Sequence, residues 1–319
     1  MLLSEKTKNV LQKINDFLER MIPITTPLSI ALGFFLPNIF IHLRPFVILL
    51  FGVMTFSGAL KLKAAELGNV VRSPFPIFLF FIATHVLMPL AALALPSLFF
   101  ANSDIVAGFV LLFAGPTAVS SFIWITVFKG DKALCLTLIL LDTLLAPLVV
   151  PGTVSILMGT KITMDMTGIA ISLLFMVVVP TIIGVALNET SKGKIPAVVC
   201  PAVDPFAKIC LMLVIAANAS PLASSIRFAD PIIWKIGLIC ITLLVLGFML
   251  AKLIGVIGKI GEEKSISLII SGGLRNNSAV MTIAVTFFPE AAVLPTLMSL
   301  IFQQIIAAII GKLLFRRQV

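Results

Sequence analysis

Two apolar stretches with small polar residues at their centres decide how this sequence folds. Residues 105–128 are IVAGFVLLFAGPTAVSSFIWITVF, and residues 265–287 are SISLIISGGLRNNSAVMTIAVTF. Each is long enough to cross the hydrocarbon core of a bilayer as a helix, which takes about 20 apolar residues. The first is interrupted by Gly115-Pro116, and the second by Gly272-Gly273 and then Arg275. Both stretches therefore predict membrane helices that are weakened or broken near their middle.

The rest of the chain is equally apolar. Of its 319 residues, 60% are hydrophobic and only 12% charged, and the mean hydropathy is +1.17. About a quarter of the residues in a soluble domain are charged, so the bilayer must surround most side chains here. The short connections between apolar segments favour a single membrane domain over residues 1–319. The basic residues are dispersed, which indicates lipid headgroups and not nucleic acid as the partner.

Ten segments are apolar enough to span the membrane, and they predict an all-α integral membrane protein with about ten transmembrane helices. Their approximate ranges are Ile24–Ile41, Pro45–Leu60, Phe75–Phe99, Ile105–Phe128, Ala133–Met158, Gly168–Leu187, Val203–Ile226, Ile232–Ile257, Ser265–Phe287 and Ala291–Leu314.

The positions of the 23 Lys and Arg residues favour an even number of spans. Lys208 and Arg275 fall deep inside spans, and the other 21 divide into 17 in the connections and span ends on one side and four on the other, which are Arg44, Lys161, Arg227 and Lys235. Basic residues collect in cytoplasmic connections. We therefore expect a multi-pass protein of the plasma membrane with its N- and C-termini in the cytoplasm.

Ten spans divide into two sets of five, about residues 1–160 and 161–319. A repeat with an odd number of spans inserts the second time with opposite orientation, so a 5+5 inverted repeat is expected. Both halves place glycine and small polar residues inside the penultimate span. Interrupted helices at matching places in two halves point to the substrate site of a transporter. Close helix packing through small residues is the alternative explanation.

These segments resemble the bile acid:sodium symporter family, which includes bacterial members that handle pantoate and other organic acids. The resemblance rests on TTP at 25–27, GVMTFSG at 52–58, Pro116 and GLRN at 273–276, and it covers nearly the whole chain. It implies a fold in which the first, second, sixth and seventh spans form a panel and the other six a core. In that fold the fourth and ninth spans are discontinuous and cross near the midplane.

The sodium ligands of the family are where this sequence departs from the resemblance. Sodium-coupled relatives carry Glu-x-Gly-x-Gln-Asn in the ninth span, whereas this chain has Ser271, Gly273, Arg275 and Asn276 there. Both the glutamate and the glutamine are missing.

Two further ligand positions of those relatives fall on Cys135 and Ile139, so oxygen is left only at Asn276, Ser121 and Thr84. A hard cation needs several oxygen ligands and usually a carboxylate. Sodium is therefore kept only as an alternative, and no other metal and no cofactor is expected.

Arg275 brings a permanent positive charge to the ninth span, because guanidinium does not deprotonate in proteins. We expect it to replace sodium, either by fixing the crossover or by contacting a substrate carboxylate. An unpaired charge at this depth costs at least about 2.5–3.5 kcal/mol, and Asp142 in the fifth span is the expected partner. Asp142 is also a candidate for proton coupling, with a static ion pair as the alternative.

The predicted function is transport of a small organic anion by alternating access, either secondary active or facilitative. Helix N-termini at the breaks favour an anion. The predicted substrate-binding residues are polar residues of the fourth, seventh and ninth spans: Thr117, Ser120, Ser121, Arg275, Asn276, Asn277 and Asn218. The predicted ion-site-like or coupling residues are Thr84, Ser121, Asp142, Ser271, Arg275 and Asn276.

Two alternatives stay open at this point. One is a sodium symporter with a site rebuilt from Ser120, Ser121, Asn276, Asn277 and backbone carbonyls, and the other is a membrane sensor or scaffold that does not transport. The sequence has no nucleophile pair and no phosphate-binding loop, so we expect neither an enzyme nor an ATP-driven pump. For His85 beside Pro89, we expect an interhelical hydrogen bond and not a role as a proton relay. No oligomeric state is predicted.

Overall fold

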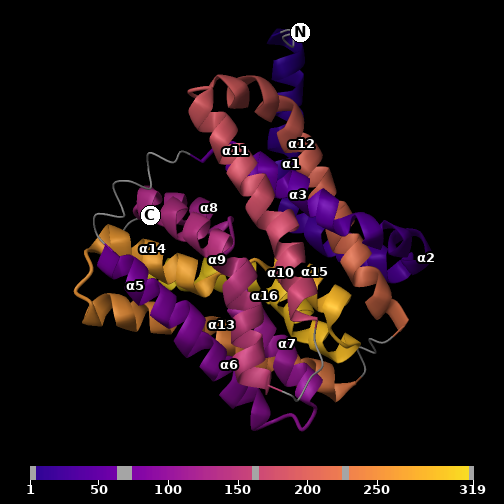
Figure 1. The fold of residues 1–319 in the computed structure, drawn as a ribbon, viewed down its shortest axis with the longest axis vertical. Coiled ribbons are helices and arrows are strands. Elements are labelled where there is room, and N and C mark those ends of the chain that lie inside the picture. The colour runs from indigo at the N-terminus through magenta and orange to yellow at the C-terminus, as the bar shows by residue number, and fades with distance from the viewer. Residues whose placement is uncertain (1–4, 63–73, 160–164, 225–229, 316–319) are drawn as a thin grey trace. The chain divides into compact units, whose positions relative to one another are not determined.

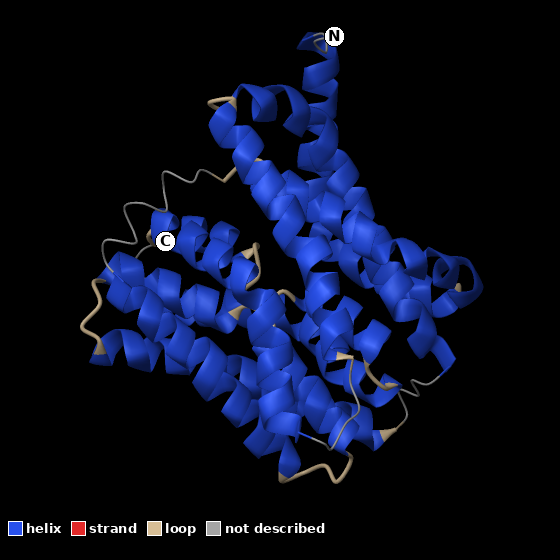
Figure 2. Ribbon diagram, in the orientation of Figure 1, coloured by secondary structure: helices blue, strands red, loops and turns tan. Residues whose placement is uncertain are grey.

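The computed structural model describes residues 5–62, 74–159, 165–224 and 230–315, and most of these residues are helical (Figure 2). No strand occurs within these four ranges, where the extended backbone pairing is an isolated bridge between Thr117 and Arg275. The all-α class predicted from the sequence is confirmed for this part of the chain.

Seven helical segments in the described ranges are long and apolar enough to cross a membrane. They are Pro37–Ala59, Pro74–Ser97, Lys132–Met158, Met166–Thr190, Lys194–Ala219, Pro231–Ile257 and Glu290–Phe315. Three shorter apolar helices, Ile24–Phe35, Ser103–Ala114 and Asn277–Phe287, lie in the first, fourth and ninth predicted spans. The protein is a multi-pass membrane protein, and the count of ten spans remains a prediction.

The chain divides into two compact units. Unit 1 is made of residues 1–64 and 172–226, and unit 2 of residues 65–171 and 227–319. Unit 1 holds the segments that the family resemblance assigns to the panel, and unit 2 those assigned to the core. Both units combine segments from the two halves of the sequence.

Unit 1 is built around the long helix α12. α1 and α3 pack along α12, and α11 packs against α3 (Figure 1). Asp204 on α12 accepts a hydrogen bond from Ser57 Oγ on α3 (2.7 Å) and pairs with Lys61 (2.8 Å). The elements are α1 (Glu5–Phe35), α2 (Pro37–Phe40), η1 (Ile41–Phe46), α3 (Val47–Ala59), η4 (Leu174–Val178), α11 (Val179–Thr190), α12 (Lys194–Ala219) and η5 (Ser220–Ser224).

Two predicted span boundaries in unit 1 are wrong. The first predicted span runs to Ile41, but α1 ends at Phe35 because Leu36 leaves the helical conformation and Pro37, which has no N–H, starts a new helix. The seventh predicted span begins at Val203, but α12 begins at Lys194, directly after Gly193 in the left-handed conformation (φ 79°).

Unit 2 contains the broken spans. Its elements are α5 (Pro74–Ile82), η2 (Ala83–Leu87), α6 (Met88–Ser97), α7 (Ser103–Ala114), α8 (Ser121–Val127), α9 (Lys132–Met158), α13 (Pro231–Ile257), α14 (Glu262–Gly273), α15 (Asn277–Phe287) and α16 (Glu290–Phe315), and α10 (Met166–Leu173) leads from unit 2 into unit 1. Side-chain caps start four of these helices, because Asn102, Asp131, Asp230 and Asn276 each accept a backbone N–H of the first turn.

α7 is the central helix of unit 2. Every residue from Ile105 to Ala114 is buried, and α6, α9, α15 and α16 pack around it. A helix that is apolar on all sides and covered on all sides is a core element and does not face lipid. At a rise of about 1.5 Å per residue, its 12 residues span roughly 18 Å, less than the roughly 30 Å hydrocarbon core. A helix in this position that starts at one membrane surface therefore ends inside the membrane.

Candidate functional site

The first break separates α7 from α8, and Pro116 is its covalent cause. α7 ends at Ala114, Gly115 is extended (φ −61°, ψ 153°), and Pro116 has no N–H with which to continue the helical ladder. A Cβ at position 115 would collide with the Val280 side chain of α15. Glycine at 115 therefore lets the two broken segments approach closely.

The second break separates α14 from α15 and contains no proline. α14 ends at Gly273, Leu274 is extended (φ −109°, ψ 121°), and α15 begins at Asn277. Asn276 caps α15, because its Oδ1 accepts the N–H of Ala279 (3.3 Å). A Cβ at Gly273 would overlap the ring of Phe248, so α14 can lie against α13 only with glycine there.

The two breaks cross each other. Ala118 N–H donates to Leu274 O (3.1 Å), and Asn276 N–H donates to Pro116 O (2.8 Å). These bonds make an antiparallel bridge between Thr117 and Arg275. The discontinuous helices predicted from the sequence therefore meet, and they are joined by their own backbones.

Side chains satisfy the backbone groups that the bridge leaves over, as they must where no water is present. Thr117 N–H donates to Asp142 Oδ2 of α9 (2.7 Å). Gln303 of α16 accepts the N–H of Arg275 and donates to its carbonyl oxygen, both at 2.9 Å. Thr117 Oγ also donates to the carbonyl of Ser271 in the last turn of α14 (3.1 Å). Gln303 is a site residue that the sequence prediction missed.

The guanidinium of Arg275 is enclosed by carbonyl oxygens. Arg275 is 1% exposed. Its Nη1 donates to Gly115 O (3.5 Å), and its Nη2 donates to Thr84 O (3.5 Å) and Gly272 O (3.4 Å). Two of these carbonyls stand at the C-terminal ends of α7 and α14, where helices carry partial negative charge. The cation is thus held where the negative ends of two broken helices and a π-helical turn converge.

Asp142 does not form the ion pair with Arg275 that the sequence predicted. No Arg275–Asp142 ion pair is present in the described ranges; the Asp142 Oδ1 atom instead lies 2.7 Å from His85 Nε2. The reason is the π-helical segment η2, which shifts the following residues around the helix axis and brings His85 to α9. Arg275 still acts on Asp142 through space. The expected interhelical hydrogen bond of His85 is confirmed.

The other predicted residues of the two breaks lie around the bridge with different partners. Ser120 is half-buried and accepts a hydrogen bond from Gln304 (3.4 Å), and Asn277 is buried and accepts one from Ser299 Oγ (3.0 Å). Ser121 is fully buried, and its Oγ has no hydrogen-bond partner among the described residues.

The remaining predicted residues divide between the units. Thr84 Oγ donates to Phe80 O within its own helix (2.8 Å), and Ser271 Oγ contacts Cys135 Sγ (4.0 Å). Asn218 is buried on α12 of unit 1. The crossover of unit 2 therefore gathers the predicted residues apart from Asn218, whose role in substrate binding stays a prediction.

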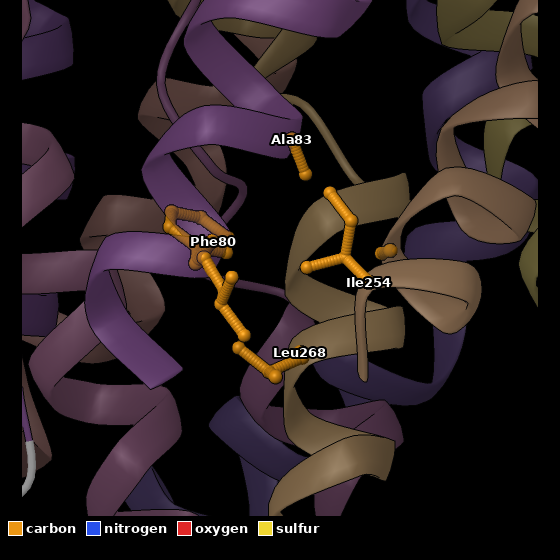
Figure 3. Close-up of a pocket in the computed structure, with 6 residues that line it drawn as sticks. Phe80, Ala83, Ile254 and Leu268 are labelled. Carbon is orange, nitrogen blue, oxygen red and sulfur yellow. The ribbon is translucent and has the colours of Figure 1, made fainter. Parts of the chain in front are cut away.

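A small apolar gap near α13 is not part of the site. It has no room for a water molecule, and it is lined by Leu79, Phe80, Ala83, Ala251, Ile254 and Leu268 (Figure 3). These side chains offer no polar group to a charged solute. Within the described ranges, no three His, Cys, Asp or Glu side chains gather to hold a metal ion.

Comparison with known proteins connects this geometry to a family. Residues 47–227 match the Sodium Bile acid symporter family. YbaS of Bacillus subtilis (strain 168) is 36% identical over 295 residues, covering 92% of this chain and 96% of that protein.

Two relatives carry sodium in their names. YocS of Bacillus subtilis (strain 168), an uncharacterized sodium-dependent transporter, is 23% identical, and the match covers 90% of this chain and 88% of YocS. The chloroplastic probable sodium/metabolite cotransporter BASS2 of Oryza sativa subsp. japonica is 22% identical, covering 89% of this chain and 67% of its own length.

Proposed function

The chain belongs to the sodium bile acid symporter family and is a membrane transporter, not an enzyme, and from this premise we propose that it carries a small organic anion by alternating access without sodium. In this proposal, Arg275 takes the place of the coupling ion. The core moves against the panel, each built from segments of two inverted five-span repeats, and the substrate binds at the crossover. The transporter lies in the plasma membrane with both termini in the cytoplasm.

The observation that carries the proposal is the carbonyl cage around Arg275. Backbone carbonyl oxygens that converge on one point replace the hydration shell of a monovalent cation in other membrane proteins. Here the carbonyls of Gly115, Thr84 and Gly272 converge on a guanidinium. The Arg275 side chain supplies the single positive charge that a bound monovalent cation would supply, but it is covalently attached to the protein. Because both terminal nitrogens are bound to the backbone, the geometry favours the role of fixing the crossover over direct contact with the substrate.

The oxygen atoms left for a sodium site are already engaged. Thr84 Oγ donates to a carbonyl, Asn276 Oδ1 caps α15, and Asn277 Oδ1 accepts from Ser299. Ser121 Oγ alone does not make the several-oxygen shell that sodium needs. This supports sodium independence and weakens the rival proposal of a rebuilt sodium site.

Two features favour an anion as the substrate. The N-terminus of α15 carries the partial positive charge of an 11-residue helix next to the crossover. Asn276 and Ser120 at the ends of the breaks are only half-buried, so the site is not closed off by protein at these two positions. A small carboxylate fits this arrangement, because negatively charged groups are stabilised near the N-terminus of a helix.

Ligand-induced stabilisation of the purified full chain tests the proposal. Thermal unfolding is followed with lactate, glycolate, benzoate or pantoate, in sodium buffer or in N-methylglucamine buffer. We expect at least one anion to raise the Tm equally in both buffers. The shift disappears in Arg275→Ala and persists in the matched control Arg44→Ala, which removes an arginine from unit 1. Stabilisation that requires sodium contradicts sodium independence, and no stabilisation by any anion favours a sensor or scaffold.

A further inference from the structure

The buried pair of His85 and Asp142 has no part in the function proposed so far. We propose that this pair is a proton-binding site, and that loading it with one proton makes the crossover ready for one monocarboxylate. The inference rests on the proposed function and names the ion that is coupled to it. Transport would then be proton symport, in which Arg275 occupies the position of sodium and the proton is the ion that moves with the substrate.

The geometry assigns the proton to a particular atom. Asp142 Oδ2 accepts the Thr117 N–H, and Oδ1 lies 2.7 Å from His85 Nε2, so an ionised Asp142 requires the ring hydrogen on Nε2. The other ring nitrogen, His85 Nδ1, is buried and has no hydrogen-bond partner among the described residues. Its lone pair is therefore the position where an added proton binds.

Charge balance explains why a proton and an anion favour each other. With a neutral imidazole, the positive charge of Arg275 and the negative charge of Asp142 cancel. A proton on His85 Nδ1 leaves one net positive charge in a buried region, which is costly unless an anion balances it. A bound carboxylate balances it, so each ligand raises the affinity of the other. The proton enters from one aqueous side and leaves to the other with the anion, and no net charge crosses the membrane.

The pair is connected to the crossover at both ends. Asp142 binds the N–H of Thr117, which is the bridge partner of Arg275. On the other side, the carbonyl oxygen of Thr84, the neighbour of His85 in η2, accepts a hydrogen bond from Arg275 Nη2. A change of charge on the pair therefore acts directly on the groups that hold Arg275 in place.

The other titratable groups on elements packed against η2, α9 or α5 have partners or positions of their own. Cys135 contacts Ser271 Oγ, and Cys240 donates to Pro295 O. Charged residues lie at or near helix ends: Asp104 in the first turn of α7, Asp131 and Lys132 at the start of α9, Glu262, Glu263 and Lys264 at the start of α14, and Lys235 and Lys252 exposed on α13.

The sequence offers a clean test of proton binding, because His42 and His85 are its only histidines. The full-length His42→Gln variant is labelled with isotopic histidine nitrogen, so every ring signal comes from His85. We expect the His85 ring to take up a proton when the pH is lowered. Adding whichever of the four tested anions stabilises the protein increases the protonated fraction of His85 at fixed pH. The inference is overturned if the His85 ring stays in one protonation state, or if a stabilising anion leaves its protonated fraction unchanged.

Proteoliposomes test the coupling. Uptake of labelled lactate, glycolate, benzoate and pantoate is measured in N-methylglucamine with and without an inward acid gradient, and uptake by protein-free liposomes is subtracted. We expect the gradient to accelerate uptake in wild type and in the control variants His42→Gln and Asp104→Asn. The acceleration disappears in His85→Gln and Asp142→Asn.

The two proposals fail in different ways. Uptake that occurs in wild type but ignores the gradient overturns proton coupling and leaves the proposed function intact, and the His85–Asp142 pair is then a static contact. If no anion is taken up and none stabilises the protein, the proposed function fails. In that case the ring titration of His85 still decides whether the pair binds a proton.

Discussion

The two broken helices of unit 2 keep their breaks open by different means. In the first, Pro116 and the extended Gly115 prevent a continuous helix by covalent structure. In the second, every residue from Leu274 to Asn276 has an N–H and could be helical. That break is held by side chains, with Gln303 on the backbone of Arg275 and the guanidinium on carbonyl oxygens.

The second break is therefore expected to be more sensitive to side-chain substitution than the first. A break imposed by proline persists when neighbouring side chains change, whereas a break held by a buried amide and a buried cation depends on them. The second break contains the cation, Arg275, and the capping amide, Asn276. The first break contributes the carbonyl oxygens of Gly115 and Pro116 and the hydroxyl of Thr117. Substitutions at one break or the other test whether the two breaks differ in this way.

The largest effect is expected for Arg275→Gln. It removes the cation from a buried network, a change that costs about 3–5 kcal/mol, and each 1.4 kcal/mol is about a factor of ten. Anion uptake in proteoliposomes should fall at least about a hundredfold. The matched Arg44→Gln variant should transport at the wild-type rate. Normal uptake by Arg275→Gln would show that the second break does not need its cation.

Gln303→Leu should be the next most severe change. It leaves the N–H and carbonyl of Arg275 buried without partners, and an unsatisfied buried group costs about 1–3 kcal/mol. The free energy of unfolding should fall by about that amount. Gln304→Leu is the control on the adjacent position, where the amide contacts the half-buried Ser120 and the indole of Trp124. An equal loss in both variants would contradict the special role of Gln303.

Asn276→Ala removes a helix cap and should cost about 1 kcal/mol of stability. Asn102→Ala removes the cap of α7 and should cost a similar amount. The two variants should differ in function, because only Asn276 lies at the crossover. Anion-induced stabilisation is expected to weaken in Asn276→Ala and to remain in Asn102→Ala. The same loss in both would place Asn276 outside the binding region.

Pro116→Ala should have the smallest effect. Pro116 is one of several constraints on the first break, because Gly115 is extended and the backbone bond from Asn276 to residue 116 does not need the ring. The expected loss is therefore about 0.4–1 kcal/mol, from the greater freedom of the unfolded chain. Uptake should stay within about threefold of wild type, a difference of roughly 0.7 kcal/mol. A collapse of transport would show that the first break also depends on a single residue.

Much of this arrangement could be predicted from the sequence. Gly115-Pro116 and the polar run after Gly272 located both breaks, because such residues in a membrane helix require a protein-lined environment. Several helix bounds also agree with the predicted spans, as for α9 and α13, since long apolar runs have clear ends. The end of α1 and the start of α12 were wrong, because Pro37 ends an apolar run early and because the residues from Lys194 to Ala202 extend α12 beyond its predicted start.

The partners of the buried charges could not be predicted, because they depend on how each helix is rotated. The π-helical turn at Ala83–Leu87 has no sequence signature, yet it brings His85 to Asp142 and presents the carbonyl of Thr84 to Arg275. Gln303 was missed for the same reason. A lone glutamine in an apolar span does not reveal which backbone it contacts.

Sodium replacement in proteoliposomes tests the central claim, that Arg275 stands in for the coupling ion. Uptake of the stabilising anion is compared in sodium and in N-methylglucamine, for wild type and for the double variant Ser271→Glu with Arg275→Gln, which rebuilds the Glu-x-Gly-x-Gln-Asn pattern of the sodium-coupled relatives. The account predicts equal uptake in both media for wild type and sodium-stimulated uptake for the double variant. Wild-type uptake that stops without sodium would contradict it.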